Sequence, residues 1–285
     1  MSVAIAALLL ACAPQSTKSA PEASADAPEA SADAPETSAD APDGGAETTD
    51  GAVPTTPAEL IDGALVLETA AGALTVTPIK HGTVFITAGD VTLWLDPWSQ
   101  GELAGPPADV VLVTDIHSDH MDAAAIGEVS QDSSVIVAPQ AVADGLEGLT
   151  VEHVLANGEE VTIEGIAIRA VPMYNLVRGP ESGGLYHDKG RGNGYLLTWG
   201  GRTVYFAGDT ECTPEMAALT GVDLAFVPMN LPYTMPPAEA AGCVNDFAPA
   251  VVVPYHYGDS DLVEFENLVS TEDVTVALVD FYPSN

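Results

Sequence analysis

A repeat that contains proline limits the part of this chain that can fold. Three copies of a seven-residue unit follow one another: Ala20-Pro-Glu-Ala-Ser-Ala-Asp, the same unit from Ala27, and a version from Ala34 with threonine in its fourth place. A seven-residue period is typical of a coiled coil, but a proline in every unit prevents a continuous helix. Residues 13–57 consist mainly of Ala, Pro, Ser, Thr, Asp and Glu and contain no aromatic residue. They cannot bury enough apolar surface to offset the entropy of ordering, so we expect a disordered, charged and extended tether.

The first twelve residues have the pattern of a lipoprotein signal. A short apolar run from Val3 ends in Leu9-Leu10-Ala11-Cys12, and in such a signal the cysteine is acylated and becomes the first residue of the mature chain. No apolar run reaches the roughly 18 residues that a bilayer-spanning helix needs. We therefore expect an exported lipoprotein, anchored to a membrane only by a lipid on Cys12, with its folded part on the periplasmic or cell-surface side. An ordinary signal peptide with a chance cysteine is the alternative.

The charge of the chain restricts its partners. There are 42 acidic residues against 7 Lys and Arg, which gives a formal net charge of −35. Such a surface repels nucleic acids and anionic membranes. Binding to nucleic acid is therefore excluded, and a small molecule is the expected substrate or ligand.

The two cysteines that follow Cys12 are Cys212 and Cys243. In an oxidising compartment they could form a disulfide. Neither lies in a spacing typical of a metal site, and we expect two free, buried thiols in preference to a disulfide.

Residues 58–285 show the same succession of elements twice, and we treat them as one folded domain. Apolar β-rich segments separated by turns come first in each half, and strands that alternate with helices follow. The first half has strands at 66–67, 74–78, 84–87, 91–95 and 109–114, a helix at 123–129, and strands at 135–137 and 151–155. The second half has strands at 160–163, 166–171, 193–198 and 203–206, then a helix at 214–219, a strand at 223–227, a helix at 237–244, a strand at 250–253 and a helix at 262–268. This order predicts an α/β (α+β) fold, a four-layer αββα sandwich of two mixed sheets with helices outside.

Four short segments place acids or histidines just after an apolar strand, where α/β sheets build their sites. They are Leu95-Asp96-Pro97-Trp98, Val113-Thr-Asp-Ile-His-Ser-Asp-His120, Ala207-Gly208-Asp209-Thr210 and Pro254-Tyr255-His256-Tyr257. The second is the most informative, because two histidines and two aspartates within six residues offer imidazole and carboxylate ligands on one tight turn. Buried charges of this kind are costly without a metal ion or a partner.

These segments resemble the metallo-β-lactamase superfamily, whose signature loop reads His-x-His-x-Asp-His. They are most similar to the branch of ascorbate-6-phosphate lactonase-like hydrolases, as is Gly192-Asn193-Gly194-Tyr195. The resemblance covers roughly Leu74 to Asp259 in order and spacing. It implies that Asp119, His120 and His256 bind one metal ion, that His117 and a further histidine bind a second, and that Asp209 bridges the two. It also implies that Asp96 orients a ligand or the loop.

The chain departs from the family pattern at two places. Asp115 replaces the first histidine of the signature; a carboxylate can bind a hard or borderline metal ion, so the site is either kept with an altered preference or holds one ion only. The further histidine is assigned to His187. The place after the strand at 166–171, where relatives can carry it, reads Met173-Tyr174-Asn175, and Asn175 is expected in the pocket. His81 begins a strand close to the place where the family keeps a histidine near its site. It has either a role in the pocket or an ordinary position at a strand edge.

The resemblance implies a hydrolase in which a metal-bound hydroxide attacks an ester, lactone, amide or phosphodiester, and Asp119 can handle the proton. One or two divalent ions are expected, with zinc first and manganese or iron as alternatives. Three of the six basic residues after the tether, Arg178, Lys189 and Arg191, fall within fourteen positions of a Gly-rich loop around His187. They suggest recognition of an anionic substrate; a solvated loop whose charges pair with Glu181 and Asp188 is the alternative. Iron-dependent redox chemistry and a non-catalytic, ligand-binding surface lipoprotein are the competing functions.

Overall fold

The computed structural model describes residues 56–283. The predicted signal at 1–12, the lipidation of Cys12 and almost all of the tether at 13–57 lie outside these residues. Among the described residues, no helix has both the length and the apolar character that crossing a membrane requires.

The first half of the domain forms an eight-stranded sheet whose strands lie in chain order. The first five strands pair antiparallel, and the last three join in parallel. The strands are β1 (Glu59–Ile61), β2 (Ala64–Thr69), β3 (Gly72–Lys80), β4 (Thr83–Ala88), β5 (Val91–Leu95), β6 (Ala108–Leu112), β7 (Ser130–Ala138) and β8 (His153–Val154).

The second half forms a seven-stranded sheet with the same change of direction. Its first four strands are antiparallel and the rest parallel. They are β9 (Glu160–Ile163), β10 (Ile166–Met173), β11 (Gly192–Trp199), β12 (Arg202–Phe206), β13 (Leu224–Pro228), β14 (Val251–Tyr255) and β15 (Thr275–Val276). The carboxyl ends of the parallel strands, which include β5 and β12, therefore share one edge of each sheet.

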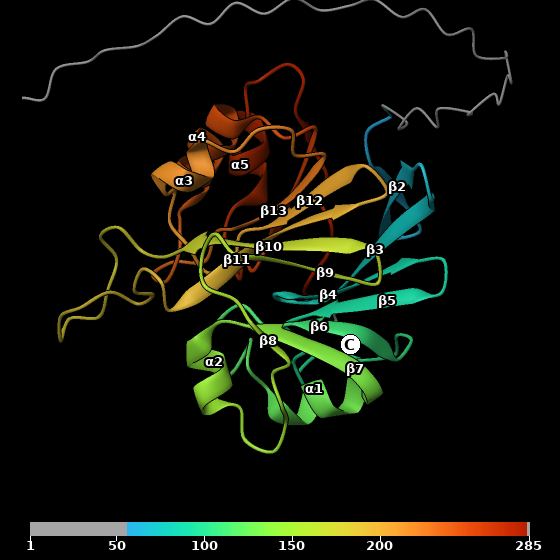
Figure 1. Cartoon of the computed structure of the whole chain (residues 1–285). Coiled ribbons are helices and arrows are strands. Elements are labelled where there is room, and N and C mark those ends of the chain that lie inside the picture. The colour runs from blue at the N-terminus through green and yellow to red at the C-terminus, as the bar shows by residue number, and fades with distance from the viewer. Residues whose placement is uncertain (1–55, 284–285) are drawn as a thin grey trace, which may run out of the picture. The chain divides into compact units, whose positions relative to one another are not determined.

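Helices cover the outer face of each sheet, because parallel strands need crossover connections. In Figure 1, α1 (Ala123–Val129) and α2 (Gln140–Gly145) lie against the first sheet, while α3 (Pro214–Ala217), α4 (Pro237–Phe247) and α5 (Leu262–Leu268) lie against the second. Asp122 caps the N-terminus of α1, because its carboxylate accepts hydrogen bonds from the N–H groups of Ala124 and Ala125. The four-layer αββα sandwich predicted from the sequence is confirmed.

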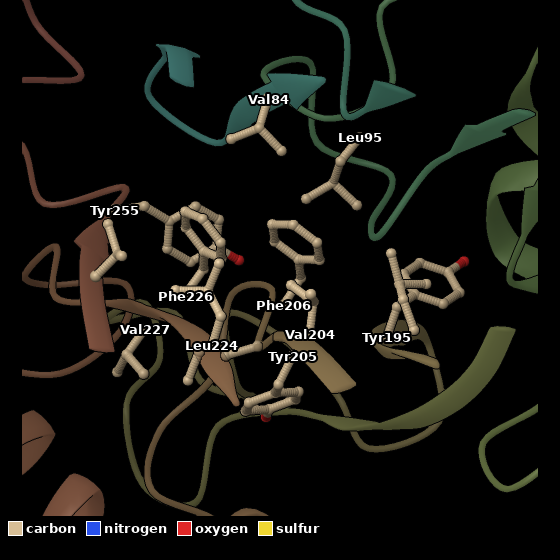
Figure 2. Close-up of a cluster of buried hydrophobic side chains, with 14 of the residues drawn as sticks. Val84, Leu95, Tyr195, Val204, Tyr205, Phe206, Leu224, Phe226, Val227 and Tyr255 are labelled. Carbon is tan, nitrogen blue, oxygen red and sulfur yellow. The ribbon is translucent and has the colours of Figure 1, made fainter. Parts of the chain in front are cut away.

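Alternating side chains along the central strands fill two separate cores. Leu93 and Leu95 of β5 belong to the core between the sheets, whereas Trp94 packs into a smaller core beneath α1 and α2. Figure 2 shows Leu95 on the side of the first sheet facing Phe206 of the second, while Tyr205 points to the opposite face. This core fixes the distance between the two sheets, and thereby the spacing of the residues at their carboxyl ends.

Short elements account for most differences from the predicted secondary structure. The strands β1 and β15 and the helix α2 were not predicted, and the strand predicted at 151–155 is limited to His153–Val154. The helix predicted at 214–219 ends at Ala217.

The expectation of two free thiols is wrong, because Cys212 and Cys243 form a disulfide. The sequence separates them by 31 residues, but α4 carries Cys243 back over the loop that follows β12, where the two Cα atoms lie 5.6 Å apart. That separation is within the range that a disulfide spans.

Candidate active site

The polar residues that follow the strands come together at the shared edge of the sheets. Asp96 directly follows β5, Asp209 lies three residues after β12, and His256 directly follows β14. His81 lies in the turn between β3 and β4. It belongs to the same group of residues, because its carbonyl oxygen accepts a 3.0 Å hydrogen bond from the N–H of His256. His81, Asp96 and His256 have φ angles of 57°, 44° and 47°, a region that side chains disfavour. Strained backbone of this kind clusters at functional sites.

Four side chains form what we call position 1: Asp119, His120, Asp209 and His256. His256 Nε2 lies 3.4 Å from Asp119 Oδ2 and 3.3 Å from Asp209 Oδ1. His120 Nε2 lies 3.4 Å from Asp209 Oδ2 and 3.8 Å from Asp119 Oδ2. All but the partly exposed Asp119 are buried.

A second cluster, position 2, consists of Asp115, His117 and His187 and shares Asp209 with position 1. His187 Nε2 lies 3.2 Å from Asp209 Oδ2 and 4.0 Å from Asp115 Oδ2. His117 Nδ1 lies 3.0 Å from the same oxygen of Asp115. The structure thus places His187 in the cluster, next to Asp209, as the interval in the sequence suggested.

A buried network fixes the orientation of His120. Its Nδ1 lies 2.7 Å from Asp96 Oδ2, and the hydroxyl and backbone N–H of Thr114 donate to the same carboxylate at 2.6 and 2.8 Å. A carboxylate accepts only, so a hydrogen of His120 resides on Nδ1, and Nε2 is the nitrogen that faces Asp209 and can bind a metal ion once it is deprotonated. Asp96 therefore acts on position 1 through His120, which is the arrangement that the resemblance implied.

An equivalent network orients His187 through Asn175. The side-chain oxygen of Asn175 accepts from the backbone N–H of His187 at 2.8 Å and lies 2.7 Å from Nδ1. Its amide nitrogen donates to Glu211 at 3.2 Å and to the carbonyl of Tyr233 at 2.8 Å, which settles which atom is the oxygen. Glu211 also accepts from the N–H groups of residues 176–178. Glu211 was not predicted: it follows Asp209 by two residues, but no motif marks it.

His81 lies beside position 1. Its Nε2 lies 3.1 Å from Asp119 Oδ2, its Nδ1 lies 2.5 Å from the Tyr282 hydroxyl, and its ring centroid lies 3.6 Å from that of His256. Burial lowers the pKa of His81, although the hydrogen bond to Asp119 opposes that effect. Of the two alternatives for His81, these contacts support a role in the site, because it lies against Asp119 and His256, which line the pocket, without lining the pocket itself.

Electrostatic interactions keep the two carboxylates of position 1, Asp209 and Asp119, ionised. Burial alone would raise the pKa of Asp209, but the charges of His256 and His120 hold it well below its usual range. Burial would likewise raise the pKa of Asp119, but hydrogen bonds with His256 and His81 lower it. For His120, the neighbouring Asp209 and Asp96 outweigh burial and raise the pKa well above 6.5. The ionised carboxylates thus lie at the middle of the centre, and imidazole nitrogens point toward them.

The donor atoms of this centre fit a divalent metal ion. Two ligand atoms on a tetrahedral ion with bonds of about 2.1 Å lie about 3.4 Å apart, and the distances within position 1 run from 3.3 to 3.8 Å. Among the described residues, five buried polar side-chain atoms lack a hydrogen-bond partner. Four of the five belong to these residues: His120 Nε2, His187 Nε2, Asp209 Oδ1 and His256 Nδ1. Unpartnered buried polar atoms are costly, and a metal ion would satisfy those that face one another.

A pocket of about 340 Å³ opens onto the centre. Its wall contains His117, Asp119, His187, Asp209 and His256, together with four residues that the sequence did not reveal, namely Ser118, Tyr186, Asn230 and Tyr233. The rings of Tyr186 and Tyr233 meet edge to face with centroids 5.0 Å apart. Asn230 could have been predicted, because it follows β13 at the same edge of the sheet as the four motif segments.

The three loop cations do not line this pocket, and each is paired with an acid, which argues against the predicted recognition of an anionic substrate by these residues. Arg178 pairs with Glu239 at 2.7 Å and with Glu211 at 3.2 Å, and Lys189 pairs with Glu215 at 2.5 Å. Arg191 grips both oxygens of Asp115, at 3.0 and 2.7 Å. The three cations therefore form ion pairs with acids that are distant in the sequence, and not with their neighbours Glu181 and Asp188.

Comparisons with known proteins agree with the fold. The model of the family described as "Beta-lactamase superfamily domain" matches residues 75–256. A UPF0173 metal-dependent hydrolase of Thermococcus kodakarensis is 32% identical over 68% of this chain and 92% of its own length. One of Pyrococcus abyssi is also 32% identical, over 70% of this chain and 94% of its own. The comparisons do not single out the lactonase-like branch, which stays a prediction.

Solved structures show the same architecture. The crystal structure of a putative metal-dependent hydrolase from Parabacteroides distasonis is 37% identical, covers 76% of this chain and 97% of its own, and has a TM-score of 0.71. A metallo hydrolase from Ignicoccus hospitalis shares the fold at 23% identity, with 73% and 95% coverage and a TM-score of 0.60. The named relatives are hydrolases, which disfavours a non-catalytic function. By the matched model, the identities and the convergence of its acids and histidines, the chain belongs to the metallo-β-lactamase superfamily, as a metal-dependent hydrolase of the UPF0173 group.

Proposed function

We propose that this hydrolase cleaves an ester, lactone or amide bond of an uncharged small molecule bound in the pocket over position 1. The observation that carries the proposal is the convergence of Asp119, His120, Asp209 and His256 at the base of that pocket, with buried donor atoms that lack protein partners. These four residues would hold the metal ion. Imidazole and carboxylate ligands in this number suit zinc, with manganese or iron as alternatives. When bound, such an ion lowers the pKa of a coordinated water molecule and polarises the carbonyl group of the substrate.

Asp119 is the group best placed to handle protons. It is the one partly exposed member of position 1, and its Oδ2 lies between His81 Nε2 at 3.1 Å and His256 Nε2 at 3.4 Å. We propose that this carboxylate accepts the proton of the attacking water and delivers it to the leaving group. His81 holds the oxygen in place and is itself held by the Tyr282 hydroxyl.

The lining of the pocket argues for an uncharged substrate. None of the described residues that line it is Lys or Arg, and the three nearby cations are taken by Asp115, Glu211, Glu215 and Glu239. A carboxylate or phosphate on the substrate would thus find no side-chain cation there. Tyr186 and Tyr233 offer ring faces to an apolar group, and Ser118 and Asn230 offer hydrogen bonds that orient it.

The test compares the zinc-loaded enzyme on matched pairs of chromogenic substrates. We expect a higher kcat/KM for neutral esters and lactones than for analogues with an added carboxylate or for phosphodiesters. Asp209→Asn should abolish the activity, and Asp132→Asn, the same change at an exposed site on β7, should leave it intact. Equal rates for neutral and anionic esters would contradict the substrate class, and no hydrolysis of any substrate would contradict the reaction.

We further propose that the enzyme is an exported lipoprotein attached to a membrane through Cys12. The disulfide between Cys212 and Cys243 supports export, because disulfides persist mainly in oxidising compartments. Cells fed an alkyne-labelled fatty acid should label the wild-type protein but not the Cys12→Ser variant. Labelling of both forms, or of neither, would refute the anchor.

A further inference from the structure

Asp115 replaces the first histidine of the signature, yet its side chain reaches position 2. The residue is fully buried. Its Oδ2 lies 3.0 Å from His117 Nδ1 and 4.0 Å from His187 Nε2. The three side chains can offer ligand atoms that all lie within 4.8 Å of one another. The substitution has therefore kept a donor at this place.

Arg191 holds Asp115 in a fixed orientation. Its Nε and Nη2 donate to the two carboxylate oxygens at 3.0 and 2.7 Å, a bidentate pair that fixes the carboxylate plane. The adjoining Gly192 packs directly on the same group, because a Cβ there would meet Thr114 O at 2.9 Å and Asp115 Oδ1 at 3.2 Å. Arg191 occupies one side of the carboxylate. The side of Oδ2 that faces His117 stays available to a metal ion.

The two charges cancel, so position 2 keeps the formal charge that a neutral histidine would give it. Asp115 adds one negative charge and Arg191, which stays protonated in proteins, adds one positive charge. The remaining ligand atoms belong to two imidazoles and to Asp209. His187 Nε2 is buried without a partner and lies 3.2 Å from Asp209 Oδ2, and this independent observation indicates that a ligand belongs there.

The geometry assigns Asp115 as a ligand of a second metal ion at position 2, with Arg191 as the positioning residue that orients it and balances its charge. This inference rests on the proposed function, which places an ion at position 1. Position 2 then offers an oxygen donor in place of an imidazole nitrogen. Carboxylate donors suit manganese better than imidazole does. Position 2 should therefore favour zinc over manganese less strongly than a position with three histidines would.

The test counts and identifies bound ions after dialysis of the full chain against buffers of defined free Zn²⁺ and Mn²⁺. Elemental analysis should find about two ions per wild-type chain and about one in Asp115→Asn, which leaves position 1 complete. The exchange D115H/R191Q leaves the net charge unchanged and restores the histidine. It should retain about two ions and raise the preference of the second ion for Zn²⁺ over Mn²⁺ by about tenfold or more.

Lys189→Gln is the matched control, because it removes one cation from the same loop at a residue that contacts Glu215 and Tyr174 instead of Asp115. It should match the wild type in both readouts. The number of ions bound by the wild-type chain does not depend on the folding of any variant. One ion per wild-type chain would overturn the inference and leave the proposed function standing. Two ions in Asp115→Asn, or an unchanged metal preference in the folded exchange variant, would also overturn it. A wild-type chain that binds no metal would refute the proposed function itself.

Discussion

Replacing Asp96 with asparagine should weaken metal binding at position 1 although Asp96 does not face the ion. The carboxylate keeps a hydrogen of His120 on Nδ1, 2.7 Å away, and so leaves Nε2 as the nitrogen that can bind the ion at position 1. An asparagine can still accept from the backbone N–H of Thr114 with its oxygen. Its NH₂ group would then face His120 Nδ1 as a donor and favour the tautomer with hydrogen on Nε2.

Metal binding to this variant requires His120 to give up the new hydrogen bond and leave an NH₂ hydrogen without an acceptor. Such a loss costs about 1–3 kcal/mol in a buried site. Since 1.4 kcal/mol corresponds to a tenfold change in an equilibrium constant, we expect the affinity to fall about 10- to 100-fold, the range typical of residues that orient metal ligands.

The assay is a competition for Zn²⁺ with a chromophoric chelator, run on wild-type and Asp96→Asn protein at the same pH. Asp109→Asn is the control, because Asp109 on β6 also accepts a backbone hydrogen bond, from Thr92 at 2.8 Å, but contacts no residue of the centre. Its affinity should equal that of the wild type. An unchanged affinity in folded Asp96→Asn would refute the argument from the tautomer of His120.

Three further predictions follow from the structure. The variant C212S/C243S should lose about 4 kcal/mol of unfolding free energy by the loop-entropy relation for a separation of 31 residues, which urea denaturation measures; a loss below about 1 kcal/mol would contradict a formed disulfide. Glu211→Gln should lose about 1–3 kcal/mol, because Glu211 accepts from the N–H groups of residues 176–178, and thermal melts that match those of the wild type would contradict this role. The neighbouring Asp209 and Asp96 outweigh burial and raise the pKa of His120 above 6.5 in the metal-free protein; since its proton must leave when a metal binds, zinc affinity should already fall with decreasing pH above pH 6.5. Calorimetry in buffers with different ionisation enthalpies would detect the released proton, and a flat affinity from pH 8 to 6 would contradict the raised pKa.

The framework of the fold could be predicted from the sequence because its central strands are apolar runs and three of its helices begin at side-chain caps, Asp122, Thr213 and Asp261. The helix at 123–129 has the predicted bounds, and Asp122 caps it. The two-residue strands β8 and β15 and the six-residue helix α2 are too short to produce a periodic pattern. They depend on their neighbours in the sheets and not on local sequence.

The site could be predicted in part, for a related reason. Acids and histidines at strand ends are visible in the sequence, and their meeting at one edge follows from the topology. Ion pairs are not visible, because Arg178 and Glu239 lie 61 residues apart and Arg191 and Asp115 lie 76 apart. Loop conformation decides which carboxylate reaches a given cation. The sequence therefore suggests an anionic substrate for the loop cations, whereas the structure pairs them with acids of the chain. The pairing of Cys212 with Cys243 escaped prediction because it depends on where α4 packs.

The most direct test of this account is X-ray diffraction from crystals of the metal-loaded protein, recorded on both sides of the absorption edge of the metal. The account predicts an anomalous peak about 2.0–2.2 Å from His120 Nε2, His256 Nε2 and carboxylate oxygens of Asp119 and Asp209. A metal-loaded crystal without a peak among these four side chains, or with the ion bound elsewhere on the chain, would contradict it.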